Sequence, residues 1–419
     1  MFPKLRFKEF DENWKEVTLK NCITSIDSGW SPQCESYPAN SSEWGVLKTT
    51  SVDWSGFNSS FNKKLPLELT PRKEIEVKPL DILVTRAGPT ERVGVVSVVP
   101  HSVRSKLMIS DKLIRLKSNE ENNPLFLGIS LSSVKCQNQL QSKTSGLAKS
   151  QTNISQKILG EVLLKLPSKE EQTKIASFLS AVDEKISQLT KKHELLSQYK
   201  QGMMQKLFSQ QIRFKADDGS EFGEWGEYKI FDLAIDKTLN NGVFNDQNKV
   251  GKGYKLINVL DMYIQRDIDE SRLSLLDIDK KEFERNKVNY GDIFFTRSSL
   301  VKEGIAFSNV YLGVSNDITY DGHLIKLSPD LNIIEPKFLN YCLKVAYVRK
   351  QLIQGGKTAT MTTIGQQEVG NTLVKIPCLE EQIRIANFLS AIDQKIDVVS
   401  KQIEQAKQWK KGLLQQMFI

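Results

Sequence analysis

The chain has 419 residues, of which 39% are hydrophobic and 26% charged, with a net charge of +8. This length and composition predict a soluble protein of two or three domains, and the positive charge suits a polyanionic partner without requiring one. The opening sequence has no apolar run typical of a signal peptide, and no stretch is long enough to span a bilayer. Five cysteines without a CxxC pair and three scattered histidines argue against a disulfide framework and a zinc site, and favour a cytoplasmic location.

The first 166 residues predict a domain of short strands and turns followed by a polar loop. Apolar, β-branched runs at 82–84 and 93–99 are typical of buried strands, and 162–166 predicts a closing strand. Residues 122–140 predict a helix, and 141–157 a loop rich in Ser, Thr and Gln.

Residues 167–209 predict one long helix. Apolar side chains recur at alternating spacings of four and three, which is the pattern of a coiled-coil seam. The seam includes Ile175, Leu179, Val182, Ile186 and Leu189. At the start, Ser168 followed by Glu171 predicts a capping box in which the carboxylate reaches back to the backbone.

Residues 210–376 repeat the plan of the first domain. The segment 212–230 resembles 1–20, since both contain Arg-Phe-Lys followed by tryptophan. The matches continue at 291–297 with 80–86, 324–327 with 113–116, 336–339 with 124–127, and 373–376 with 163–166. The loops between these stretches do not match, so two domains of one fold with different surfaces are expected to recognise different things.

The last stretch, 377–419, repeats the long helix without a gap, 210 residues after its first copy. Its seam includes Ile385, Leu389, Ile392, Ile396 and Val399. Since the second domain starts where one helix ends and finishes where the other begins, antiparallel helices give the shorter path, with the domains at opposite ends.

We therefore predict an α+β fold with a circular, pseudo-two-fold repeat. It has two similar α/β target-recognition domains, 1–166 and 210–376, and two antiparallel coiled-coil helices, 167–209 and 377–419. The alternative is that each helix packs on the surface of its own domain.

Several catalytic motifs are absent from the sequence. There is no phosphate-binding Gly-x4-Gly-Lys-Ser/Thr and no Pro-Pro dipeptide of the kind in an amino-methyltransferase signature. Ser110-Asp111-Lys112 lacks one residue of a nuclease Asp-x-Lys pattern. Asp81 and Asp292 recur in both halves, but an acid that opens a strand usually serves turn geometry.

The repeated block, PSKEEQTKIASFLSAVDEKI and then PCLEEQIRIANFLSAIDQKI, resembles the repeats of type I restriction–modification specificity subunits. The resemblance covers essentially the whole chain, and Cys378 is its main departure. It implies a non-catalytic, DNA-reading subunit for a bipartite asymmetric site. It also implies partners, namely double-stranded DNA, two methyltransferase subunits and restriction subunits. S-adenosylmethionine, ATP and Mg²⁺ would belong to those partners, so no cofactor or metal is expected here.

Basic residues in the loops are candidates for DNA contacts, because lysine and arginine bind phosphates and arginine pairs with guanine. The candidates are Lys48, Arg86, Arg92, Lys143 and Lys149 in the first domain and Lys252, Lys255, Arg297, Lys302 and Lys357 in the second. Arg86 and Arg297 share a place after a buried strand, which suggests a shared role such as phosphate positioning. For any single lysine, solvated surface charge is the simpler interpretation.

The repeated helices are expected to set the spacer between half-sites and to bind methyltransferase subunits. The candidate docking and coiled-coil residues are Ile175, Phe178, Leu179, Val182 and Ile186, with Ile385, Phe388, Leu389, Ile392 and Ile396. Three alternatives stay open: a standalone nuclease or methyltransferase, which the absent motifs oppose, a structural coiled-coil adaptor that binds no nucleic acid, and a standalone DNA-binding coiled-coil adaptor without restriction partners.

Overall fold

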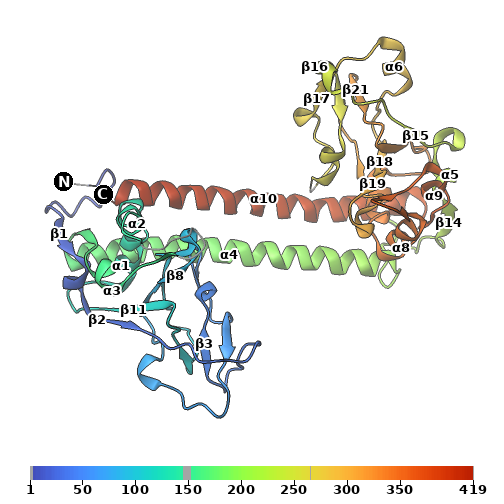
Figure 1. The fold of residues 1–419 in the computed structure, drawn as a ribbon. Helices are drawn as coiled ribbons and strands as arrows, with labels where there is room; N and C mark the ends of the chain where they lie inside the picture. Colours follow the sequence, from blue (N-terminus) through green and yellow to red (C-terminus); the bar gives the residue numbers. More distant parts are fainter. Residues whose placement is uncertain (1–2, 145–151, 265, 419) are drawn as a thin grey trace. The chain divides into compact units, whose positions relative to one another are not determined.

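The structure of the protein, a computed structural model, describes residues 3–144, 152–264 and 266–418. The chain divides into two compact units (Figure 1). Unit 1 is Met1–Leu189 with Gln402–Ile419, and unit 2 is Thr190–Lys401. Each unit therefore contains one β-rich domain and a segment of each long helix. The sequence predicted a different division, into two target-recognition domains and two long helices, and that division stays a prediction.

Unit 1 is built on a four-stranded antiparallel sheet in the order β2-β11-β7-β9. These strands are Ile23–Ser28, Leu113–Ser118, Ile82–Thr85 and Val96–Val98. A second sheet, β10-β3-β6, comprises Leu107–Met108, Gly45–Leu47 and Asn62–Lys64, with β10 parallel to β3. The remaining pairs are β1 (Lys15–Thr18) with β13 (Leu163–Leu166), β4 (Val52–Asp53) with β5 (Gly56–Phe57), and β8 (Ala87–Gly88) with β12 (Thr152–Asn153).

The predicted strands at 82–84 and 162–166 are confirmed, whereas the strand expected at 93–99 is only Val96–Val98. The helix predicted over 122–140 is two helices, α1 (Pro124–Leu131) and α2 (Val134–Gln141). They separate because Ser133 has an extended backbone and its hydroxyl accepts from the amide of Cys136, which caps α2. The predicted loop 141–157 contains β12 and the first residues of α3 (Gln156–Gly160), and part of it lies outside the described residues.

Unit 2 repeats this topology. The antiparallel sheet β15-β22-β18-β20 comprises Asn240–Asn241, Leu324–Leu327, Ile293–Thr296 and Ser308–Val310. The sheet β17-β16-β21 comprises Ser274–Leu276, Val250–Ile257 and Ile318–Tyr320, with β16 parallel to β21. Smaller sheets pair β14 (Gly226–Lys229) with β25 (Leu373–Ile376), and β19 (Ser298–Ser299) with β24 (Thr362–Thr363) and β23 (Lys357–Thr358). The helices of this domain are α5 (Ile230–Leu233), α6 (Lys280–Arg285), α7 (Pro336–Cys342), α8 (Ala346–Gly355) and α9 (Gln366–Gly370).

Asp81 and Asp292 precede the matching central strands β7 and β18. Each carboxylate accepts a hydrogen bond of 2.8 Å from the amide three residues earlier, so the predicted turn role is confirmed. Each also faces a buried cation on the neighbouring strand, Arg115 at 3.8 Å and Lys326 at 3.5 Å. Burial raises the pKa of both carboxyls. These acids therefore hold the scaffold together.

The long helices α4 (Lys169–Phe208) and α10 (Leu379–Met417) run antiparallel. In unit 1, Asp183 of α4 pairs with Lys410 near the end of α10 at 2.5 Å. In unit 2, Lys200 near the end of α4 pairs with Asp393 of α10 at 2.6 Å. Asp183 matches Asp393 and Lys200 matches Lys410 in the repeat, so the two ion pairs are the same pair with the two helices exchanged, as antiparallel packing of two copies of one repeat requires.

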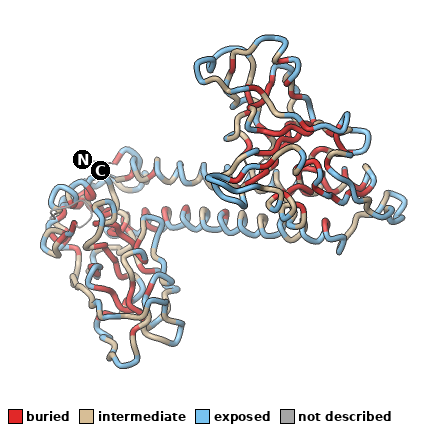
Figure 2. The backbone as a smooth tube through the Cα atoms, turned by 45° about the vertical axis from the view of Figure 1, so that its right-hand side comes forward, coloured by how far each residue is buried: buried red, intermediate tan, exposed pale blue. Residues whose placement is uncertain are grey.

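The apolar seam of the helices belongs to the core of each unit. In unit 1, Ile175, Leu179 and Val182 share one buried cluster with the sheet and with Leu413 and Met417 of α10. Figure 2 shows the buried residues concentrated in the β-rich part of each unit. Both packing modes considered from the sequence therefore occur together, since each helix segment packs on a domain and on the other helix.

A buried glutamate ties the start of each long helix to the segment that begins each domain. Glu171 accepts from Arg6 through Nε and Nη2, both at 2.7 Å, and from the indole of Trp14 at 3.4 Å. Hydrogen bonding to Glu171 raises the pKa of Arg6. The prediction that Glu171 caps its own helix is therefore wrong, because a bidentate ion pair is stronger than a bond to a neutral amide. The predicted capping role of Ser168 is confirmed, since its hydroxyl accepts from the backbone amide of Glu171 at 3.3 Å.

The same interaction recurs in unit 2. Glu381 accepts from Arg213 at 3.1 and 2.7 Å and from Trp225 at 3.2 Å. We call these two sets of contacts, Glu171 with Arg6 and Trp14 and Glu381 with Arg213 and Trp225, the glutamate locks. Ring contacts extend both: Trp14, Phe126 and Phe418 in unit 1, and Trp225, Phe338 and Phe208 in unit 2.

The circular arrangement of the repeat is confirmed at the chain ends. In unit 2 the chain continues from α4 into the next domain, and the amide of Ile212 donates to the carbonyl of Lys206 at 3.4 Å. In unit 1 the equivalent bond joins the two ends of the chain, from the amide of Leu5 to the carbonyl of Gln416 at 3.0 Å. Among the described residues, no helix is long and apolar enough to cross a membrane.

Candidate nucleic-acid interface

The residues after the matching central strands occupy the same place in both units. Arg86 follows β7 and Arg297 follows β18. The amide of Arg86 donates to Lys112 at 2.8 Å and that of Arg297 to His323 at 2.9 Å, and both carbonyls accept from the strand that returns beside them. Neither guanidinium bonds to another residue within the described parts of the chain. The backbone is therefore held on both sides, while the guanidinium has no hydrogen bond or ion pair among the described residues.

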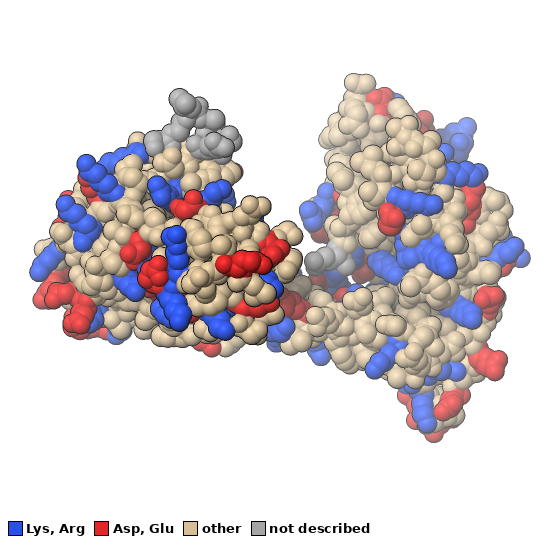
Figure 3. All heavy atoms as spheres, turned by 60° about the horizontal axis from the view of Figure 1, so that its bottom comes forward, with Lys and Arg blue, Asp and Glu red and all other residues tan. Residues whose placement is uncertain are grey.

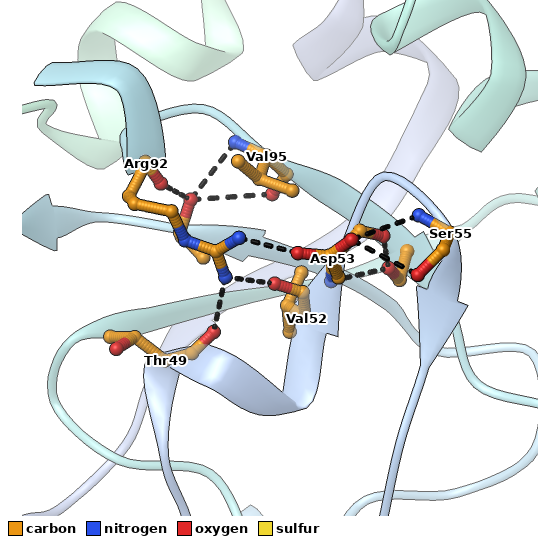
Figure 4. Close-up of polar contacts among 8 residues, drawn as sticks. Thr49, Val52, Asp53, Ser55, Arg92 and Val95 are labelled. Carbon is orange, nitrogen blue, oxygen red and sulfur yellow. Dashed lines mark hydrogen bonds and ion pairs between the residues drawn. The ribbon is translucent and has the colours of Figure 1, made fainter. Parts of the chain in front are cut away.

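Arg92 has a different environment (Figure 4). Its Nη1 pairs with Asp53 at 2.5 Å, and its Nη2 donates to the carbonyl of Val52 at 2.7 Å. The Arg92 guanidinium holds the pKa of Asp53 below its usual value, helped by hydrogen bonds from Ser55. Arg92 thus fixes the turn between β4 and β5, and its charge is already partnered.

The other candidates of unit 1 lie around these loops. Lys48 is half-buried at the start of the 3-10 helix Thr49–Ser51, whose first carbonyl accepts from Arg92 at 3.4 Å. Lys143 is exposed after α2. Lys149 lies outside the described residues.

In unit 2 the structure brings three candidates to one small sheet. Arg297 leads into β19, Lys302 begins the next 3-10 helix, and Lys357 lies on β23. Thr363 of β24 pairs with Ser298 on one side and Lys357 on the other, so β24 lies between the strand that follows Arg297 and the strand that carries Lys357. Arg297 and Lys302 are exposed, and Lys357 is 83% exposed beside Glu368 at 3.3 Å.

Lys252 and Lys255 belong to another sheet, on β16. Lys252 pairs with Asp277 at 2.8 Å, and Lys255 pairs with Asp317 at 3.2 Å. The hydrogen bond from Lys252 lowers the pKa of Asp277. The pKa of Asp317 is lowered chiefly by the hydroxyl of Ser315 and then by Lys255. The ammonium of each lysine is therefore already paired with a carboxylate, whereas the guanidinium of Arg297 has no such pair among the described residues.

A polar network next to Arg297 was not predicted from the sequence. The amide of Asn245 donates to Asn258 at 2.8 Å and to Asp321 at 3.0 Å, and Asp321 is 2.8 Å from the imidazole of His323. The network borders a cavity of about 320 Å³. These residues are far apart in sequence and follow no periodic pattern, so the sequence contains no signal for them.

Charge on the surface is mixed. Figure 3 shows Lys and Arg side chains interspersed with Asp and Glu on the face drawn. The net charge of +8 is therefore not gathered on that face.

The comparisons with known proteins agree with this architecture. The type I restriction modification DNA specificity domain matches residues 34–197 and 223–408, which together are more than half of the chain. The chain is 40% identical over 171 residues to the EcoEI specificity subunit of Escherichia coli, an alignment that covers 40% of this chain and 29% of that subunit. It is 24% identical over 424 residues to the putative MjaX specificity subunit of Methanocaldococcus jannaschii, covering 99% and 94%.

The fold is similar to that in the crystal structure of the type I restriction–modification S subunit from M. genitalium. The TM-score is 0.62 at 16% sequence identity, and the alignment covers 100% of this chain and 99% of that one. Two matching domains, each followed by one copy of a repeated helix, define the chain as a tandem target-recognition protein. It belongs to the type I restriction–modification DNA specificity family and carries two of its domains. The resemblance found in the repeated helix is confirmed.

Proposed function

We propose that the chain is the non-catalytic specificity subunit of a type I restriction–modification complex. Each domain reads one half of a bipartite, asymmetric DNA site, and the helix pair sets the spacer. The observation that carries this is a matched scaffold with unmatched loops. Arg86 and Arg297 occupy one scaffold position, yet five residues later unit 1 has Glu91 and unit 2 has Lys302, both exposed. Shared positions suit contacts to the uniform phosphate backbone, and differing ones suit different base sequences.

Methyl transfer and cleavage would then be performed by partner chains. Methyltransferase subunits would bind S-adenosylmethionine, and restriction subunits would use ATP and Mg²⁺. Support comes from family membership and from the absence of the corresponding motifs in the sequence. A complex with two methyltransferase subunits suits a chain whose helix surface occurs twice.

The test exchanges one domain. Residues 226–376 are replaced by the equivalent stretch of another specificity subunit, which keeps β14 together with its partner β25. Expressed with the methyltransferase, the hybrid is expected to methylate a site in which one half is new and the other is unchanged. Sequencing of modified bases in genomic DNA is the measurement. A change in both halves would overturn the modular proposal.

The alternative of an adaptor that does not bind DNA is not favoured by the family match. In this case the complete chain would show no gel shift on random duplex DNA at low salt. The DNA-reading proposal instead expects binding that weakens steeply with salt, because phosphate contacts release counterions.

The methyltransferase subunits are proposed to bind the exposed faces of α4 and α10. Most of the seam residues named from the sequence are buried in the cores of the units, so we place the docking surface elsewhere on the helices. Phe178 is half-buried against Phe7, with 5.8 Å between the ring centroids. Phe388 is half-buried against Phe214, with 5.7 Å between the ring centroids. The repeat positions Tyr199 and Trp409 are better candidates, because they are matched aromatic residues that are 51% and 53% exposed. Exposed aromatic side chains are enriched at protein interfaces.

We expect Tyr199→Ala combined with Trp409→Ala to reduce co-purification of the methyltransferase at least tenfold, as loss of two hot-spot aromatics would. The control is Leu67→Ser, which removes a side chain that is 87% exposed outside the repeats. Circular dichroism checks that both variants are folded. A folded double variant that retains the methyltransferase would contradict the proposed docking surface.

A further inference from the structure

His323 in unit 2 is an exposed imidazole that the fold holds in one orientation. Its side chain is 66% exposed. Its carbonyl accepts from the amide of Arg297 at 2.9 Å, and its own amide donates to Oδ1 of Asp321 at 2.7 Å. Nδ1 of the ring lies 2.8 Å from the same carboxylate oxygen. The backbone and the ring are therefore both fixed, although most of the ring faces solvent.

The carboxylate of Asp321 determines which ring nitrogen carries the hydrogen. The Asp321 side chain is 7% exposed, and its other oxygen accepts from the side-chain amide of Asn245 at 3.0 Å. An ionised carboxylate can only accept hydrogen bonds, so the neutral imidazole of His323 has its hydrogen on Nδ1. Its Nε2 then has a free lone pair and forms no hydrogen bond with any residue that the structure describes. The neutral ring therefore presents one oriented acceptor to solvent.

The turn that carries His323 also forms in unit 1, where the side chains are different. Because the strands β11 and β22 match, Ser110 corresponds to Asp321 and Lys112 to His323. The amide of the first strand residue donates to the carbonyl of Ser110 at 3.0 Å in unit 1 and to that of Asp321 at 2.9 Å in unit 2. The turn therefore requires neither the carboxylate nor the imidazole, and turn geometry alone does not explain them.

This position also lies beside the arginine that the two units share. The carbonyl of Lys112 accepts from the amide of Arg86 at 2.8 Å, just as that of His323 accepts from Arg297. Lys112 is exposed, as His323 is. A lysine ammonium is a donor, whereas Nε2 of a neutral imidazole with its hydrogen on Nδ1 is an acceptor. The two units thus present opposite hydrogen-bonding groups from one backbone position, as readers of different base edges would.

We propose that His323 is a specificity-determining residue of unit 2, whose Nε2 accepts a hydrogen bond from the exocyclic amino group of adenine or cytosine in the major groove. The inference rests on the proposed function, because it requires that unit 2 reads one half-site. Adenine and cytosine present amino donors in that groove, whereas guanine and thymine present acceptors and are rejected. Asp321 and Asn245 are positioning residues, which orient the ring without contacting the base.

The first experiment determines the tautomer in the complete chain by nitrogen NMR with labelled histidine. The chain has three histidines, and His323→Gln identifies the signals of His323 by their loss. At about pH 8 we expect hydrogen on Nδ1 and none on Nε2. Asp321→Ser, which gives unit 2 the residue of unit 1, should keep the turn and shift hydrogen towards Nε2. A wild-type ring with hydrogen on Nε2 would overturn the proposal, because Nε2 would then be a donor.

The second experiment uses the chain in its complex with the methyltransferase, with sequencing of modified bases as the readout. The half-site of unit 2 is first identified by the domain exchange described above. His323→Lys should change one required adenine or cytosine to guanine, because lysine donates to O6 and N7 of guanine. His323→Ala should leave that position degenerate, with discrimination lowered roughly fivefold to a hundredfold. The half-site of unit 1 is the internal control and should stay the same in both variants.

His323→Gln is the conservative variant, since its amide oxygen is again an acceptor, and it should retain the wild-type base. Circular dichroism checks that all variants are folded. Folded variants that methylate only the wild-type sequence, or that all lose methylation including His323→Gln, would overturn the proposal and leave His323 a structural role. If the domain exchange changes no half-site, the proposed function itself fails. If the exchange changes one half-site but the variants retain its bases, only the role of His323 fails.

Discussion

At the scale of single residues, Lys344 is a charged side chain whose burial destabilises the fold. It lies between α7 and α8, and its ammonium is 5.7 Å from the ring of Phe307. The titratable groups around it are Lys200, Arg266, Asp267, Lys337, Tyr341 and Asp393. Burial, and then repulsion by Lys200, lower the pKa of Lys344 to about 8. The folded state therefore disfavours the protonated, positively charged form that this lysine has at neutral pH.

Replacing Lys344 with methionine should stabilise unit 2 at pH 7, by about 1–2 kcal/mol after allowance for its partial exposure. The folded pKa lies below the unfolded value, so the wild-type penalty is complete below about 8 and shrinks as the pH rises towards 10. Urea unfolding of both chains at pH 7 and pH 10 measures this. We expect a clear gap at pH 7 that narrows at pH 10. A variant no more stable than wild type at pH 7 would contradict the explanation.

At the scale of elements, the two glutamate locks explain why Glu171 of the first copy of the repeat recurs as Glu381 in the second. Each lock joins the start of a long helix to the segment that leads into the domain preceding that helix, through Arg6 in one unit and Arg213 in the other. The ion pairs Asp183 with Lys410 and Lys200 with Asp393 then set the register between the helices. The two helices can therefore be lengthened by whole heptads.

Inserting one heptad after Leu189 in α4 and another after Val399 in α10 keeps the apolar seam in phase. Each helix lengthens by about 10 Å, since each residue rises about 1.5 Å. At about 3.4 Å per base pair this corresponds to roughly three pairs of duplex. We expect the methylated site to have a spacer longer by about two to four pairs, or methylation to be lost because the second half-site is also rotated around the duplex.

The control inserts a heptad into α4 alone, which breaks the pairing between Asp183 and Lys410 and should abolish methylation. Modified-base sequencing gives the readout. If the double insertion methylates the site at its original spacing, the helices do not set the spacer.

At the scale of the whole molecule, the architecture is a duplication whose two copies have diverged at the surface. The order of the strands in the scaffold sheets and the two locks correspond between units, whereas the loops after Arg86 and Arg297 differ in sequence and in the positions of their charges. A protein that reads an asymmetric site needs this kind of divergence, because two identical domains would read two identical halves.

The sequence by itself determined the duplication, the two long helices and the matching central strands. These features follow from local periodicity and from the repeat of 210 residues, and neither depends on knowing which distant residues meet. The turn role of Asp81 and Asp292 was likewise predictable, because the acid and the amide that it accepts from are three residues apart.

Only the tertiary structure decided which side chains are already partnered. Arg92 and Arg297 look equivalent as loop arginines, yet Asp53 lies 39 positions from Arg92 and holds it, while Arg297 is left exposed. Glu171 was expected to bond within its own helix, but Arg6, 165 positions away, binds it instead. The physical reason is the same in each case. Charge pairing and cavity shape depend on contacts between distant segments, which packing creates and which no local pattern encodes.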